Sequence, residues 1–144
     1  MVQLRPARIE DAAEIARLAG ELGYPVETTA MAARLRAILP LRQHHVTVAV
    51  GGCKGLVGWI AVERRLTLEA GERVEIVGLV VDASARGSGV GRALVADAES
   101  WALALGFDAI GVRSNVARED SHPFYECLGF ARVKTQHMYR KRLE

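Results

Sequence analysis

A glycine-rich turn carries the clearest chemical pattern in the sequence. It reads Arg86-Gly87-Ser88-Gly89-Val90-Gly91-Arg92 and lies between a stretch that predicts a buried strand and one that predicts an amphipathic helix. Glycine allows positive φ and lets a ligand approach the backbone closely. The helix that follows offers unpaired N–H groups and the positive end of its dipole. The turn therefore predicts a site for an anion, and the alternative is a strand-to-helix turn that binds no ligand.

Two common nucleotide-binding patterns do not fit this turn. A Walker A loop requires Gly-Lys-Ser/Thr, whereas Gly91 is followed by Arg92. A dinucleotide-binding pattern read from Gly87 or Gly89 would require glycine at position 92 or 94, where the sequence has Arg and Leu. What remains is Arg-x-x-Gly-x-Gly, which begins at Arg86.

An acidic residue, Glu75, interrupts the apolar stretch that precedes the turn. A carboxylate in a buried strand costs free energy unless it is paired or hydrated, so Glu75 predicts a polar cleft. The competing interpretation is an ion pair with Arg73 or another arginine. Glu72 is an alternative acidic residue, but it lies nearer the preceding turn and is expected to be solvated.

The Arg-x-x-Gly-x-Gly turn resembles the pyrophosphate-binding loop of the GNAT superfamily of N-acetyltransferases, which binds acetyl-CoA. The turn follows Leu79-Val80-Val81-Asp82, the strand end and loop start usual in that family, and it precedes the expected helix. The resemblance implies acetyl-CoA as the co-substrate.

A second group of residues, between positions 114 and 130, is similar to another block of the same family. The family block reads Asn … Ala-His-x-Phe-Tyr-x-x-x-Gly-Phe, and it is matched here by Asn115, His122, Phe124, Tyr125, Gly129 and Phe130, with Ser121 in place of alanine. Two motifs in the right order are more specific than either alone. The resemblance covers about residues 44–140, and the N-terminal helices also fit the family's order.

The resemblance implies contacts with acetyl-CoA at both motifs. The implied cofactor-binding residues are Leu79, Val80, Val81, Arg86, Gly87, Ser88, Gly89, Val90, Gly91, Arg92, Asn115, His122, Phe124 and Tyr125. Asn115 would contact the pantetheine arm or the bound amine, or else be a turn residue at a strand end. His122 is expected to hold the helix that follows it or to contact the cofactor.

Acetyl transfer to an amine sets chemical requirements. An alkyl amine resembles Lys, with a pKa of about 10.4, so a base helps it to attack as the neutral form. A backbone N–H at the splayed end of the central strand can stabilise the oxyanion. The resemblance implies that Tyr125 protonates the leaving thiolate, with a packing role as the alternative. The family's Glu-x-x-x-Leu-x-Val spacing, here Glu75, Leu79 and Val81, implies that Glu75 is the general base, acting directly or through water.

Hydrophobic periodicity predicts the elements that must position these residues. We expect strands at about residues 2–8, 46–50, 56–62, 74–81, 109–112, 131–134 and 136–140, and helices at about 11–22, 28–39, 90–105 and 119–128. Asp11 is expected to cap the first helix. The order β α α β β β α β α β β predicts an α+β (mixed α/β) fold with a largely antiparallel sheet and about four flanking helices, as in the GNAT fold. The length of 144 residues fits one domain over residues 1–144.

Composition and charge exclude several functional classes. The formal net charge of +2 is too small for a dedicated nucleic-acid-binding protein. No apolar run approaches the roughly 20 residues of a membrane span, and the first residues contain no apolar signal core, so a cytoplasmic location is expected. Cys53 and Cys127 lie among apolar neighbours, which predicts buried thiols in a reducing compartment and no metal site. His44 and His45 are expected to be structural or exposed.

The sequence thus predicts an acetyl-CoA-dependent N-acetyltransferase that transfers the acetyl group directly to a primary amine of a small molecule. Within the superfamily the two motifs look most similar to aminoalkylphosphonate N-acetyltransferases. The alternatives are a protein N-terminal or lysine acetyltransferase and a noncatalytic acetyl-CoA-binding module. The presence of both Glu75 and Tyr125 argues against the module, since binding alone requires neither. The resemblance also allows a homodimer, whereas no nucleic acid or membrane partner is expected.

Overall fold

The computed structural model of the chain describes residues 2–51, 55–114 and 121–144. Two compact units, divided between Arg113 and Ser114, are described separately. The first unit contains β1 (Gln3–Pro6), the 3-10 turn η1 (Ile9–Asp11), α1 (Ala12–Glu21), α2 (Thr28–Ile38), β2 (His44–Val50), β3 (Leu56–Thr67), β4 (Gly71–Val81), the 3-10 turn η2 (Ala83–Ala85), α3 (Val90–Ala104) and β5 (Gly111–Val112). The second contains α4 (Ser121–Cys127).

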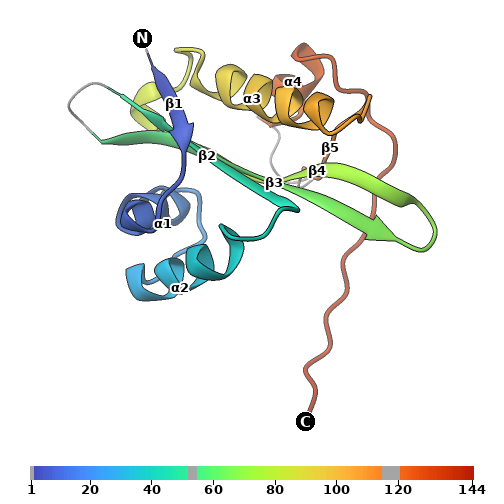
Figure 1. Ribbon diagram of the computed structural model, residues 1–144, viewed down its shortest axis with the longest axis horizontal. Coiled ribbons are helices and arrows are strands. Elements are labelled where there is room, and N and C mark those ends of the chain that lie inside the picture. The colour runs from blue at the N-terminus through green and yellow to red at the C-terminus, as the bar shows by residue number, and fades with distance from the viewer. Residues whose placement is uncertain (1, 52–54, 115–120) are drawn as a thin grey trace. The chain divides into compact units, whose positions relative to one another are not determined.

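The first unit is built on one five-stranded sheet in the order β1-β2-β3-β4-β5. The first four strands are antiparallel to their neighbours, and β5 runs parallel to β4. Helices α1 and α2 lie on one face of the sheet and α3 on the other (Figure 1). The predicted largely antiparallel sheet with flanking helices is therefore confirmed.

Helix α3 is fixed against the sheet by close packing and by a polar contact. Gly58 on β3 leaves room for the helix, since an added Cβ would lie 3.1 Å from both Val90 Cγ1 and Leu94 Cδ1. On β2, His45 Nε2 lies 2.9 Å from Asp97 Oδ2 of α3, and the buried Thr47 hydroxyl donates to the same oxygen at 2.6 Å. These contacts set the position of the helix that follows the glycine turn, and they give His45 the structural role expected of it.

An irregularity in β4 marks the middle of the sheet. Gly78 pairs with Ala61 and Ile76 with Val62, so Val77 is an extra residue in β4 and is 53% exposed. The pairing of β5 with β4 is limited to Glu75 and Ile76, so over the described residues β4 has no β5 partner from Val77 onward. Gly78 has no side-chain alternative here, because an added Cβ would lie 2.8 Å from Trp59 Cζ3. A glycine within an apolar strand is the sequence signal for such a site.

The predicted helices and the first five predicted strands are confirmed, with changed bounds. Strand β3 extends to Thr67, beyond the predicted end at residue 62, and β5 is only two residues long. Asp11 precedes α1 as predicted, but its side chain does not cap that helix. Its Oδ2 accepts from the backbone N–H of Arg8 at 2.8 Å, and both carboxylate oxygens pair with Arg5 at 2.8 Å.

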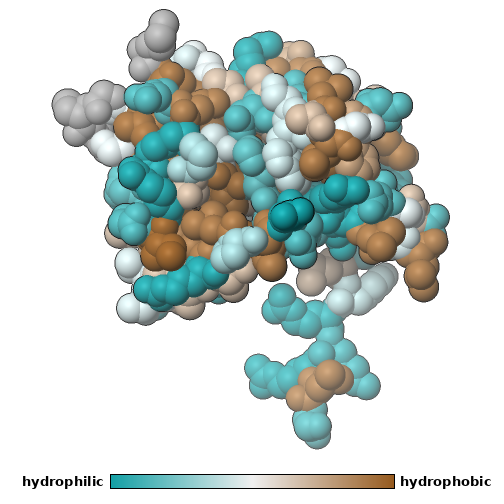
Figure 2. Space-filling view, in the orientation of Figure 1, coloured by the Kyte–Doolittle hydropathy of each residue, from teal (hydrophilic) through white to brown (hydrophobic). Residues whose placement is uncertain are grey.

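The two strands predicted at residues 131–134 and 136–140 are wrong, because residues 131–144 contain no regular secondary structure. Their apolar residues are exposed, including Val133 at 89% and Tyr139 at 89%. Figure 2 shows this segment as mostly hydrophilic side chains with a few hydrophobic ones among them. A strand is stabilised by neighbours that bury one of its faces, and the alternating pattern alone does not provide them. The predicted burial of Cys127 is also wrong, since this free thiol is exposed at the end of α4, and Cys53 lies outside the described residues.

Candidate active site

The glycine turn leads from β4 into α3 as the sequence predicts. Residues 86–89 form an exposed turn, and the first turn of the fifteen-residue helix α3 contains the buried Val90 followed by Gly91 and Arg92. Gly87 and Gly89 have φ of +82° and +89°, and a Cβ added to either would meet no atom of the described residues within 4 Å. The backbone here requires glycine and faces open space. It is therefore accessible to a ligand, next to the unpaired N–H groups of a helix N-terminus.

Hydrogen bonds within the chain fix the entry to the turn. Asp82 Oδ1 accepts from the backbone N–H and the hydroxyl of Ser84, both at 2.9 Å, which caps η2. The backbone N–H of Asp82 donates to the carbonyl of Val57 at 2.8 Å, so the residue is also tied to β3. Ser88 donates from its N–H and its hydroxyl to the carbonyl of Ala85. The hydrogen bonds from Ser84 lower the pKa of Asp82, which is therefore charged at neutral pH.

The end of β4 supplies the other predicted cofactor-binding residues of this unit. Leu79, Val80 and Val81 pair with Ile60, Trp59 and Gly58 of β3. Val80 is buried, and the two residues beside it are half-buried. Strand β5 pairs with β4 only at Glu75 and Ile76. Within the described residues, β5 therefore does not pair with the backbone edge of residues 79–81.

Glu75 lies in the middle of β4, is only 6% exposed, and is held by arginines. Its Oε2 accepts from Arg113 Nε at 3.2 Å and from Arg65 Nη1 at 3.4 Å. Burial acts to raise its pKa, but the hydrogen bond from Arg113 and the charges of Arg113, Arg65 and Arg73 outweigh burial and lower the pKa below its usual value. The ion pair that the competing interpretation requires is therefore present, with Arg65 and Arg113 as the hydrogen-bonding partners. Glu72 is exposed and pairs with Arg64 at 2.6 Å.

Sequence reasoning missed the role of Arg113 and Arg65. Arg113 is 38 residues from Glu75 along the chain and reaches it because β5 pairs in parallel with β4. Arg65 reaches it because β3 and β4 form a hairpin in which Glu63 stands opposite Glu75. The alternation of apolar and polar residues within one strand does not predict either contact.

The second unit contains the predicted residues of the second motif. The ring of Tyr125 on α4 makes edge contacts with Phe124 at 5.1 Å and Phe130 at 5.6 Å between centroids. Burial raises the pKa of Tyr125, so its hydroxyl remains protonated at neutral pH. His122 is half-buried in the first turn of the helix, whereas Asn115 lies outside the described residues.

Over residues 2–51, 55–114 and 121–144, no group of three His, Cys, Asp or Glu side chains is arranged to hold a metal ion. Among the helices in these same ranges, none is both long enough and apolar enough to span a membrane.

The family is established by a match across most of the chain. The sequence pattern of the Acetyltransferase (GNAT) family matches residues 10–130, which include the glycine turn and the second motif. The chain belongs to this family.

The chain is also similar to individual proteins. The uncharacterised N-acetyltransferase YhdJ of Bacillus subtilis (strain 168) is 34% identical over 67 residues, which cover 46% of this chain and about half, 47%, of YhdJ. The crystal structure of a transcriptional regulator from Bacillus halodurans C-125 is 27% identical, with a TM-score of 0.79 over 100% of both chains. Aminoglycoside N-acetyltransferase AAC(6')-Iy in complex with CoA has a TM-score of 0.87 over 99% of this chain and 96% of its own. At 20% identity, this last likeness shows the fold alone.

Proposed function

We propose that the protein is an acetyl-CoA-dependent N-acetyltransferase that acts on a primary amine of a small molecule. The observation that carries the proposal is the exposed glycine turn at the head of α3. Gly87 and Gly89 have positive φ there, and no atom stands where their side chains would be. An exposed backbone beside a helix N-terminus suits the pyrophosphate of acetyl-CoA. Family membership and the fold shared with a CoA-bound aminoglycoside N-acetyltransferase support the assignment.

The residues proposed to bind acetyl-CoA divide by the part of the ligand that they would contact. The backbone N–H groups of residues 86–92 other than Ser88 would bind the pyrophosphate, and the backbone edge at residues 79–81, which β5 does not pair with, would bind the pantetheine arm. In the second unit, the resemblance assigns cofactor contacts to Asn115, His122, Phe124 and Tyr125. Because the family match runs across both units, we propose that residues 1–144 act as one domain.

In the proposed reaction the neutral amine attacks the thioester carbonyl and a C–N bond forms. The C–S bond then breaks, and the sulfur leaves as a thiolate that takes up a proton. Tyr125 is the proposed proton donor, and the raised pKa of its hydroxyl keeps the proton available at neutral pH. The transfer is direct, with no acetylated side chain of the enzyme.

Glu75 is proposed as the base that accepts the amine proton, directly or through water. A general base works best when its pKa lies near the working pH, and the lowered pKa of Glu75 makes it a weak base. Its ion pairs with Arg65 and Arg113 provide a second role, in which the carboxylate holds those two side chains in place. The two roles differ in their dependence on pH, so a pH profile of Glu75→Gln separates them.

The proposed function is tested by following thiol release from acetyl-CoA. The full chain is incubated with aminoglycosides, aminoalkylphosphonates, simple primary amines and a lysine-containing peptide, with an amine-free control. We expect turnover with at least one small amine. Turnover with the peptide alone would replace the proposal with protein acetylation, and acetyl-CoA binding without turnover would replace it with a binding module. A chain that binds no acetyl-CoA would contradict all three, and sedimentation of the same sample tests the homodimer that the resemblance allows.

A further inference from the structure

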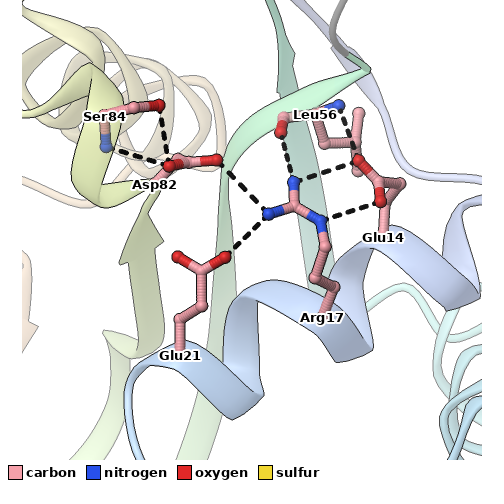
Figure 3. Close-up of polar contacts among 6 residues, drawn as sticks. All are labelled: Glu14, Arg17, Glu21, Leu56, Asp82 and Ser84. Carbon is pink, nitrogen blue, oxygen red and sulfur yellow. Dashed lines mark hydrogen bonds and ion pairs between the residues drawn. The ribbon is translucent and has the colours of Figure 1, made fainter.

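Arg17 on α1 reaches the residue that leads into the glycine turn. Its Nη1 donates to Asp82 Oδ2 at 3.3 Å, and its Nη2 donates to the carbonyl of Leu56 at 3.1 Å (Figure 3). Asp82 uses its other oxygen to cap η2 through Ser84. One guanidinium therefore connects a helix on the face of the sheet, the start of β3, and the end of β4 where the turn begins.

The same guanidinium lies among three carboxylates. Besides Asp82, it contacts Glu14 through Nε at 2.9 Å and Nη2 at 3.1 Å, and Glu21 through Nη1 at 2.8 Å (Figure 3). Glu14 in turn accepts from the backbone N–H of Leu56 at 3.3 Å. The hydrogen bond with Glu14 is the largest cause that raises the pKa of Arg17, so the cation is permanent. Three acidic groups and one basic group give this cluster a formal charge of −2.

This arrangement affects an anion at the turn. Asp82 lies four residues before Arg86, at the start of a segment proposed to bind a pyrophosphate. A carboxylate near that site repels the phosphates, and Arg17 is the cation that lies against it. Arg17 also holds the side chain whose other oxygen fixes η2. Loss of the guanidinium would leave Asp82, Glu14 and Glu21 unbalanced and η2 less firmly placed.

We propose that Arg17 is a positioning residue for acetyl-CoA: through its contact with Asp82 it holds the entry to the glycine turn and balances the acidic charge beside it. The inference rests on the proposed function, because it concerns how the same turn binds the same ligand. Arg17 touches neither the turn nor the reacting atoms, so its removal affects the binding of acetyl-CoA and leaves the chemical step intact.

The test compares Arg17→Gln with Arg5→Gln. Arg5 makes a bidentate pair with Asp11 at 2.8 Å, elsewhere in the same unit, and its loss controls for removal of an ion pair. Acetyl-CoA affinity is measured by calorimetry, and KM and kcat with one good amine. For Arg17→Gln we expect Kd and KM for acetyl-CoA to rise about 5- to 20-fold with kcat nearly unchanged, because the lost contact acts on the ligand indirectly and its effect is smaller than that of a full charged hydrogen bond. For Arg5→Gln both constants should stay within about twofold of wild type.

A double-mutant cycle tests whether Arg17 acts through Asp82. Asp82→Asn keeps an oxygen that can accept from Ser84 but removes the charge that pairs with Arg17. We expect the effects of Arg17→Gln and Asp82→Asn on Kd to be strongly non-additive. Additive effects, an unchanged Kd in Arg17→Gln, or an equal rise in Arg5→Gln would overturn the proposal.

A replacement variant and a wild-type control make the outcome of the Arg17→Gln experiment unambiguous. If Arg17→Gln does not fold, as judged by its melting curve, Arg17→Lys replaces it. This variant keeps the charge but not the forked contacts, so an increase in KM of at least about twofold supports the proposal and a wild-type KM overturns it. If the wild-type chain itself binds no acetyl-CoA, the proposed function fails together with the inference. Normal wild-type binding with an unaffected Arg17→Gln variant defeats the inference alone.

Discussion

The middle of β4 and the turn that follows the strand each contain a carboxylate whose pKa is lowered and that pairs with arginine, but their surroundings differ. Glu75, in the middle of the strand, is 6% exposed and has its charge balanced by Arg65 and Arg113 from the neighbouring strand and the end of β5. Asp82, just after the strand, has a side chain that is 17% exposed. It is held first by the backbone and hydroxyl of Ser84 and then by Arg17.

This difference separates two ways of building a site. In the middle of β4, burial would make a lone carboxylate costly, so the arginine partners decide whether Glu75 is charged. At the turn, the carboxylate organises local backbone, and the exposed backbone is itself the proposed binding surface. Substitutions in the middle of β4 should therefore act through charge and pH, and substitutions at the turn through backbone conformation.

The largest effect is expected at the turn. Gly89→Val places a β-branched side chain at φ +89° and on the surface proposed to bind the pyrophosphate, so acetyl-CoA affinity should fall at least about 100-fold. Gly71→Val is a matched control, because Gly71 has φ +72° and equally open surroundings at the far end of β4. Both variants should lose stability, by about 1–3 kcal/mol. Calorimetry with acetyl-CoA should separate them, and equal affinity in the two variants would remove the turn from the binding site.

A smaller effect, on rate rather than on binding, is expected in the second unit. Tyr125→Phe removes the proposed acid, and kcat should fall about 100-fold, the low end for general-acid catalysis, because a thiolate leaves partly unaided. Acetyl-CoA affinity should change much less. Tyr139→Phe, at a side chain that is 89% exposed, is the control and should be neutral. If kcat in Tyr125→Phe is normal while chemistry is rate-limiting, the tyrosine only packs against Phe124 and Phe130.

The role of the Glu75 carboxylate in the middle of β4 is tested with Glu75→Gln, which preserves the shape of the side chain but cannot accept a proton. We expect kcat/KM to fall about tenfold at neutral pH and to recover toward pH of about 10, where the amine is neutral without help. The measurement is a pH profile with one good amine, with Glu72→Gln as the exposed control. If the kcat/KM profiles of wild type and Glu75→Gln stay parallel over pH, Glu75 positions the substrate or its two arginine partners. A lower Tm with a normal rate would assign it to stability alone.

The smallest expected effect concerns stability and pH. Asp11 is 7% exposed, and its pKa is lowered chiefly by the hydrogen bond from Arg5. A carboxylate with a lower pKa in the folded chain stabilises it above the unfolded value of about 3.9, and this contribution is lost as the pH falls through the folded pKa. Asp11→Asn should thus cost about 1–2 kcal/mol at pH of about 7 and almost nothing well below the folded pKa, measured by urea unfolding. If the loss in free energy of unfolding does not vary with pH, lost packing and not lost charge destabilises the variant.

The contrast between the two regions also explains what could be predicted. The turn was predictable because its function depends on glycine and on local order along the chain, and Gly87, Gly89 and the start of α3 are where the pattern placed them. The helices followed from their apolar periodicity. Gly78, inside an apolar strand, is a sequence signal for the irregularity in β4.

The surroundings of Glu75 were not predictable, because they depend on strand register. Whether Arg65, Arg73 or Arg113 reaches the carboxylate is decided by a hairpin and a parallel pairing, and an isolated sequence specifies neither. The contact between Arg17 and Asp82, 65 residues apart, was missed for the same reason. The prediction of the final two strands is wrong for a related reason: the alternation of apolar and polar residues at 131–140 does not establish burial, and Val133 and Met138 are exposed.

The strand order has a consequence for folding kinetics. Strands β2, β3 and β4 are consecutive and antiparallel, so their hairpins close over short loops, whereas β4 and β5 pair in parallel only after α3 has been crossed. We expect the central hairpins to be formed in the transition state and the β4–β5 pairing to form after it. Substitutions in β3 should then slow folding, and substitutions near Gly111 should mainly speed unfolding. The ion pair between Glu75 and Arg113 would accordingly be among the last contacts made and the first lost.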